Sequence, residues 1–360
     1  MNYLRFFSQV VCCSGYTRFL VSDTTTGQMH FYPAKIGKII SDEANYSTIE
    51  NIFEKINSKD KELFQMVIND LVTNDLAFIT KKSDRFPSMT GVYNQKIDDF
   101  ENAHVVFYNN NFPHLKPLVK VLDEIGVKAV KLDFKSLEEP EMLTILHEFN
   151  KSGVHSIECV IDLNGEINPG KHIDNICSVN GALTMLSILN LPIEPIDHSS
   201  EVLVSHALTA FPKIIPNFEL YSEAIDRNPY FNGKLFIGSC GEVKMSEKSK
   251  KIYGYIQDVN IVHKLNKRND LKKFWGISKN IIDICKDCEF RYFCVDDRRP
   301  RARKNGTFFF EEECRFNPYI SKWSNESGHV SIIETGVNVT ETETLINDER
   351  VVEINMQVWK

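Results

Sequence analysis

Hydrophobic and polar positions along the first 85 residues follow two patterns, the short apolar runs of β-strands and the spacing of amphipathic helices. Residues 18–22 and 29–32 are short apolar runs on either side of a stretch rich in Thr and Gly, which predicts a β-hairpin. A sequence with the form of a capping box at 47–50 and apolar residues at helical spacing over 63–71 predict two helices, followed by another short strand. This order of strands and helices predicts a winged-helix-like domain over residues 1–85.

Beyond a polar stretch, buried strands alternate with amphipathic helices. Strand-like runs begin near residues 104, 127 and 155, and helix-sized segments that end in glycine separate them. This spacing is typical of βαβ units in a parallel sheet. Because residues 100–230 are too few for eight such units, the predicted fold class is α/β, with a partial (β/α) barrel or an open sheet.

The remaining residues, 231–360, differ in pattern from both of these regions. Residues 231–325 begin with a predicted hairpin and continue into a window rich in cysteine, whereas residues 326–360 are an acidic tail without recognisable chemistry. The sequence therefore predicts four parts, with the cysteine-rich region as the carrier of the chemistry.

Composition and charge narrow the classes of function. The chain has 360 residues, of which 42% are apolar and 25% charged, and its net charge is −7. This charge disfavours a nucleic acid as the partner of the whole chain. No run approaches the roughly 18 consecutive apolar residues of a membrane span, and the N-terminus makes a poor export signal. We therefore expect a cytoplasmic protein that does not enter the membrane.

Four of the nine cysteines form the most informative motif. Cys285, Cys288 and Cys294 have the spacing C-x2-C-x5-C, and Cys314 follows. Four thiolates from so short a window suit tetrahedral zinc or a [4Fe–4S] cluster, and sulfur ligands exclude calcium and magnesium. An odd number of cysteines in a chain without an export signal favours metal ligands over disulfides.

This motif resembles the SPASM domain of radical S-adenosylmethionine enzymes that modify peptides. In that family, cysteines equivalent to these four hold the second of two auxiliary [4Fe–4S] clusters. The G-x4-C element of the family has its counterpart at Gly241–Ser246, with Ser in place of Cys, and Arg298 stands where another cysteine of the motif is expected. The resemblance therefore implies one [4Fe–4S] cluster, on Cys285, Cys288, Cys294 and Cys314, and the loss of the other.

The motif that binds S-adenosylmethionine in these enzymes is missing from the sequence. It has the form C-x3-C-x2-C and follows the first barrel strand, but no three cysteines of this chain have that spacing. We therefore do not expect S-adenosylmethionine as a cofactor. The fold implied by the resemblance is a reduced radical-S-adenosylmethionine-like barrel.

The sequence around the cysteines is similar to that of one subgroup, the SPASM-domain peptide maturases of grasp-with-spasm systems. Residues 285–300 and 314–323 carry this likeness. The family's proteins are encoded beside an ATP-grasp ligase and a small precursor peptide. The resemblance implies maturation of a ribosomally synthesised, post-translationally modified peptide, in which the N-terminal domain binds the precursor's leader as an added strand. Because the cysteines that bind S-adenosylmethionine are absent, we expect the chain to act as an accessory or substrate-presenting protein.

Several alternatives stay open at this level. Zinc is the alternative occupant of the cysteine site, and a redox or radical enzyme that uses the remaining cluster is the alternative activity. A zinc-bearing winged-helix protein that binds nucleic acid is a third reading. Beside the cysteines, Asp297, Arg298 and Arg299 could damp the charge of a cluster or hold an acidic peptide, or could form a solvated charged loop.

Overall fold

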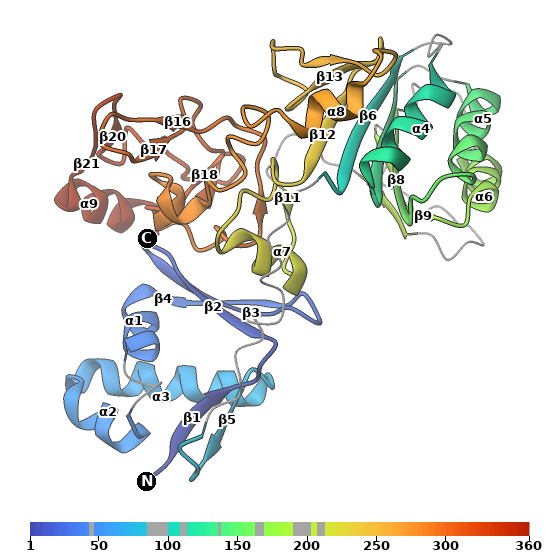
Figure 1. Cartoon of the computed structure of the whole chain (residues 1–360). Coiled ribbons are helices and arrows are strands. Elements are labelled where there is room, and N and C mark those ends of the chain that lie inside the picture. The colour runs from blue at the N-terminus through green and yellow to red at the C-terminus, as the bar shows by residue number, and fades with distance from the viewer. Residues whose placement is uncertain are drawn as a thin grey trace. The chain divides into compact units, whose positions relative to one another are not determined.

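The computed structural model describes residues 1–42, 47–84, 100–108, 114–135, 138–162, 169–189, 203–206 and 213–359. It divides into two compact units (Figure 1). The first consists of Met1–Gln95, Pro212–Pro229 and Gly276–Lys360, and the second of Lys96–Phe211 and Tyr230–Trp275. These bounds differ from the predicted ones, because the N-terminal and cysteine-rich regions share a unit.

The N-terminal part of the first unit contains a three-stranded antiparallel sheet followed by three helices. The strands are β2 (Val10–Ser14), β3 (Arg18–Asp23) and β4 (Met29–Pro33), in the order β2-β3-β4. The helices are α1 (Ala34–Asp42), α2 (Ile49–Lys55) and α3 (Ser58–Thr73), and β1 (Tyr3–Phe6) pairs with β5 (Ala77–Thr80). The β3–β4 hairpin and the last two helices lie where the sequence predicts them.

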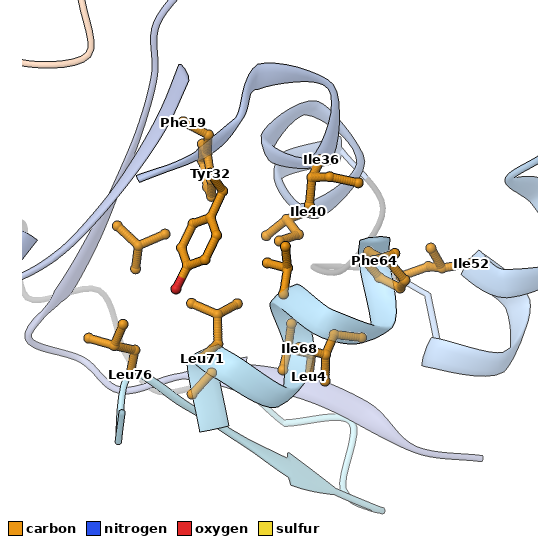
Figure 2. Packing of buried hydrophobic residues seen from close by; sticks show 13 residues of the cluster. Leu4, Phe19, Tyr32, Ile36, Ile40, Ile52, Phe64, Ile68, Leu71 and Leu76 are labelled. Carbon is orange, nitrogen blue, oxygen red and sulfur yellow. The ribbon is translucent and has the colours of Figure 1, made fainter. Parts of the chain in front are cut away.

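Side chains from all of these elements form one core (Figure 2). Phe19 of β3, Ile36 of α1 and Phe64 of α3 are fully buried in it. The hydroxyl of Tyr32 donates to Asp70 at 2.6 Å, which joins β4 to α3. Gly37 lies directly against the ring of Phe19, so a side chain at this position of α1 would collide with the core.

The second unit is built on an eight-stranded sheet in the order β10-β9-β8-β7-β6-β12-β13-β14. The first six strands in this order are parallel to one another, and the last two are antiparallel additions. The parallel strands are β6 (Asn102–Tyr108), β7 (Ala129–Lys135), β8 (Ser156–Asp162), β9 (Leu183–Leu189), β10 (Leu203–His206) and β12 (Lys234–Ile237). The prediction of an α/β fold with a mostly parallel sheet is confirmed.

Helices connect the parallel strands as the βαβ pattern predicts. They are α4 (Leu115–Ile125), α5 (Glu139–Phe149) and α6 (Pro169–Val179), with the short α8 (Ile261–Asn266) beside α4. The predicted hairpin after residue 231 forms between β12 and β13 (Glu242–Lys244), followed by β14 (Gly254–Tyr255). Because β12 also pairs with β6, residues 231–275 belong to this unit and not to the cysteine-rich region.

The cysteine-rich part of the first unit has short elements. They are η2 (Lys279–Ile281), η3 (Cys285–Asp287), and the pairs β11 (Lys213–Ile214) with β15 (Cys294–Val295), β16 (Arg301–Ala302) with β17 (Phe308–Phe309), and β18 (Phe316–Asn317) with β19 (Lys322–Trp323). The helix α7 (Phe218–Ala224) belongs to the same unit. None of the described helices is long and apolar enough to cross a membrane.

The acidic C-terminal segment is folded, contrary to its description as a tail. It forms the hairpin of β20 (Val337–Val339) and β21 (Thr344–Ile346) and then the helix α9 (Asp348–Val358). Ile332, Val337 and Val351 from this segment are buried against Tyr319. The sequence prediction missed this core because its apolar residues are few and widely spaced among acidic ones.

Candidate metal centre

The four cysteines predicted as ligands come together in the structure. All four line one small cavity of about 30 Å³, which Phe290, Phe316 and Trp323 also line. Cys285 and Cys288 lie at the start and just beyond the end of η3, Cys294 begins β15, and Cys314 precedes β18. Cys285 and Cys294 are buried, and the other two are half-buried.

Hydrogen bonds from backbone N–H groups close in sequence set the positions of three of these thiols. In η3, the Cys288 N–H donates to the Cys285 carbonyl at 3.0 Å, which folds the C-x2-C segment into a tight turn. The Phe290 N–H donates to the Cys288 Sγ, and the Phe316 N–H donates to the Cys314 Sγ, both at 3.4 Å. Hydrogen bonds of this kind to sulfur orient metal-bound thiolates and reduce their charge.

Two cations lie beside the thiols, the buried Lys279 and the half-buried Arg298. The Lys279 ammonium donates to the Cys294 carbonyl at 3.0 Å, and Lys279 is only 2% exposed. Burial raises the pKa of the Cys285 thiol and of the Cys294 thiol to about 12, and Lys279 opposes this rise at both. Arg298 opposes it at Cys285 as well. The site is therefore apolar and partly buried, with positive charge placed to favour thiolates at Cys285 and Cys294.

The donor set fits a metal centre that binds through sulfur. Four soft donors line one small cavity, as zinc and iron–sulfur sites require, and N–H groups that donate to two of the sulfurs would reduce the charge of bound thiolates. The four thiols are of the kind that zinc and iron–sulfur centres use, but within the described residues no group of three or more His, Cys, Asp or Glu side chains, these cysteines included, is placed so that it could hold a metal ion.

Arg298 also lines the cysteine cavity, but its charge is already paired. Its Nε donates to both carboxylate oxygens of Asp296 at 3.0 Å, and its Nη1 donates to the Glu312 carbonyl at 2.7 Å. The structure therefore places Arg298 next to the thiols and ties it to Asp296. Of the other two predicted residues, Asp297 is half-buried and Arg299 is exposed.

The N-terminal sheet packs on the loop that carries the cysteines. The Tyr16 N–H donates to the Asp287 carbonyl at 2.7 Å, and Arg291 Nη1 donates to the Ser14 carbonyl at 2.6 Å. Cys13 on β2 lies with its sulfur 3.9 Å from the Cys288 carbonyl. The edge formed by β2 is thus covered by the cysteine loop.

A buried ion pair strengthens the same contact. Arg18 on β3 pairs with Glu289, with 2.7 Å between Nη2 and Oε1, and the Glu289 side chain is fully buried. The Arg18 guanidinium also lies over the rings of Phe31 and Phe290. Sequence reasoning missed Arg18, Glu289 and Lys279, because nothing in their local sequence shows which distant segment they meet.

The sheet of the second unit carries a further set of ionisable side chains. His104 on β6 lies 3.7 Å from Asp133 on β7, and Lys135 lies 3.0 Å from the other carboxylate oxygen of Asp133. Lys131 and Glu158 form a similar pair across β7 and β8, at 3.7 Å. The sequence analysis does not single out these residues, because their pairing depends on the register of the parallel strands.

No family model matches the chain, and no curated protein matches it either. Among solved structures, Streptococcus suis SuiB is similar with 8% identity and a TM-score of 0.31 over 81% of this chain and 94% of that one. SuiB bound to S-adenosylmethionine and SuiB bound to precursor peptide SuiA have 9% identity and TM-scores of 0.30 and 0.29 over the same shares of the two chains.

Proposed function

We propose that this chain is a maturation protein for a ribosomally synthesised, post-translationally modified peptide. In this proposal Cys285, Cys288, Cys294 and Cys314 hold one [4Fe–4S] cluster. The similarity of residues 285–300 and 314–323 to SPASM-domain peptide maturases supports it, as does the single cavity that all four thiols line. The winged-helix-like and SPASM-like assignments of the two parts of the first unit belong to the same proposal.

The observation that carries the proposal is the edge of the N-terminal sheet. One edge, β2, is covered by the cysteine loop, whereas β4 pairs only with β3 among the described strands. An exposed sheet edge accepts an extended peptide as an additional strand, and the main-chain hydrogen bonds give much of the affinity. The precursor's leader would therefore bind along β4.

The register of the hairpin identifies the backbone groups that face outward. The Asp23 N–H donates to the Gln28 carbonyl at the turn end of the ladder, and bonded and non-bonded pairs alternate from there. Met29 and Phe31 are consequently non-bonded positions. Their N–H and carbonyl groups point away from β3 and have no hydrogen-bond partner among the described residues, so a leader strand could pair with them.

The chain's role in this proposal is to bind and present the precursor to an ATP-grasp ligase. The sequence lacks the C-x3-C-x2-C motif, so cleavage of S-adenosylmethionine is not part of the proposal. Residues 109–113, which follow β6 where that motif would stand, lie outside the described residues. A bound cluster would supply a one-electron redox centre and a covalent brace for the loop beneath the N-terminal sheet.

Retention of the precursor by a β4 variant tests this proposal. Met29→Pro removes one outward N–H at the first residue of an edge strand, where proline is tolerated, and Met29→Ala is the matched control. Loss of a main-chain hydrogen bond of about 1 kcal/mol predicts roughly fivefold weaker binding, and steric interference by the proline ring adds to this loss. The measurement is anaerobic co-purification of the chain with a precursor peptide and an ATP-grasp ligase of the proposed system. Retention of neither partner by the unaltered chain, or equal retention by both variants, would refute the proposal.

A further inference from the structure

A second cavity lies directly beside the cysteine cavity, within the same unit. Its volume is about 360 Å³, and Cys285, Cys314 and Arg298 line both cavities. Pockets of several hundred Å³ are the size that binds small ligands or large side chains. Any group bound here would contact the walls of the cysteine site.

The inner walls of this pocket are mostly apolar, and the two buried or half-buried charged residues among them, Asp283 and Arg298, are ion-paired. Phe309 and Phe310 come from β17 and the residue after it, and Ile284 comes from the cysteine loop. The folded C-terminal segment supplies Ile332 and Ile333, of which Ile333 is 69% exposed. A large aliphatic side chain this exposed, beside a pocket, suits contact with an apolar ligand.

The rim of the pocket is acidic. Glu311, Glu312, Glu313 and Glu341 line it and are exposed. The nearby cations are already paired, since Arg298 binds Asp296 and Arg301 binds Glu311. Within the described residues, Glu312 and Glu341 have no ion-pair partner. The pocket thus combines an apolar interior with free negative charge at its mouth.

We propose that this pocket binds a large apolar side chain of a peptide whose neighbouring residue is lysine or arginine. The apolar side chain would enter between the two phenylalanines and Ile333, and the cation would meet Glu312 and Glu341. This inference deepens the proposed function, since it assigns to the precursor a basic and apolar segment held beside the cysteines.

The test uses two blocked dipeptides and the full chain, purified without oxygen. We expect acetyl-Phe-Lys-amide to bind at least about tenfold more tightly than acetyl-Phe-Glu-amide in ligand-observed NMR titrations, because like charges at the rim penalise the second probe. Equal affinity of the two probes, or absence of binding by acetyl-Phe-Lys-amide, would overturn the proposal.

Amino-acid substitutions test whether acetyl-Phe-Lys-amide binds in this pocket. Ile333→Asn should weaken acetyl-Phe-Lys-amide about tenfold, whereas Val352→Asn, a matched change at an exposed position of α9 outside the pocket, should not. Glu312→Gln combined with Glu341→Gln should remove the preference between the probes, and Glu247→Gln, in the other unit, should preserve it. Binding that survives both pocket changes would refute the assignment.

The result of the dipeptide test does not depend on the result of the precursor test. The probes contain no leader and require no ligase, so normal dipeptide binding with failed co-purification would refute leader capture alone. Normal co-purification without dipeptide binding would refute the pocket alone.

Discussion

Replacement of Arg18 by alanine tests the contact between the N-terminal sheet and the cysteine loop. The Glu289 side chain is 0% exposed, its Oε1 accepts from Arg18 Nε at 2.8 Å, and its Oε2 has no hydrogen-bond partner among the described residues. Arg18→Ala therefore leaves a buried carboxylate without its pairing cation. Removal of one partner of a buried ion pair costs about 3–5 kcal/mol, because the remaining charge stays desolvated.

The lower end of that range applies here, since the Arg18 side chain keeps 27% of its exposure to solvent. A loss of about 3 kcal/mol raises the equilibrium population of the locally opened state roughly a hundredfold, and amide exchange through that state speeds up by the same factor. The assay is hydrogen exchange followed by mass spectrometry, which reads peptides of β3 and of the cysteine loop separately. The amides of both segments should exchange faster together, because the ion pair joins them.

Two further variants make this prediction specific. Arg350→Ala removes an exposed pair with Glu353 on α9 and should leave exchange in β3 unchanged. Glu289→Gln together with Arg18→Leu removes both charges and should restore part of the protection that Arg18→Ala loses. Less than threefold acceleration in β3 for Arg18→Ala would refute the reasoning.

Three other predictions concern the metal ligands, the first core and the C-terminal hairpin. Cys288→Ser should lose most of the bound metal, whereas Cys240→Ser, at an exposed thiol, should retain it in elemental analysis. Gly37→Ala should lower the free energy of unfolding by about 1–3 kcal/mol in urea titrations, because its methyl group would collide with Phe19; equal stability would contradict the packing. Arg303→Met should open the β20–β21 hairpin, because Arg303 is buried and binds a buried carboxylate; unchanged hydrogen exchange in that hairpin would contradict this.

Local elements could be predicted from the sequence because short-range patterns determine them. The hairpin over 18–32 and the strands near 104, 127 and 155 appear as β3–β4, β6, β7 and β8. Each depends on alternation, turn residues or spacing within a few tens of residues. The grouping of Cys285, Cys288, Cys294 and Cys314 is of the same kind, since three of them lie within one loop.

Long-range partners could not be predicted in the same way. β12 looks like half of an isolated hairpin, yet it joins the parallel sheet beside β6. Lys279 and Glu289 look like surface charges, yet both are buried because cations or carbonyl groups from other segments meet them. Hydrophobic periodicity reports which face of an element is buried but not which element covers it.

The apolar pocket beside the cysteines was missed for a related reason. Its walls join the cysteine loop to the hairpin at Val337–Ile346, and the sequence of that hairpin is mostly acidic and polar. The packing of Ile332 and Val337 against Tyr319 and the hydrogen bond from the Thr344 hydroxyl to Asp283 bring the two regions together. A chemical motif in the sequence could therefore locate the thiols but not the space next to them.

The most direct measurement of the central claim is the iron, sulfide and zinc content of the chain, purified without oxygen, together with its absorption spectrum. The account predicts about four irons and four sulfides per chain, with the broad absorption of a [4Fe–4S] cluster, and the loss of both in Cys288→Ser. One zinc ion per chain and no iron would contradict the cluster, and a chain free of any metal would contradict the site itself.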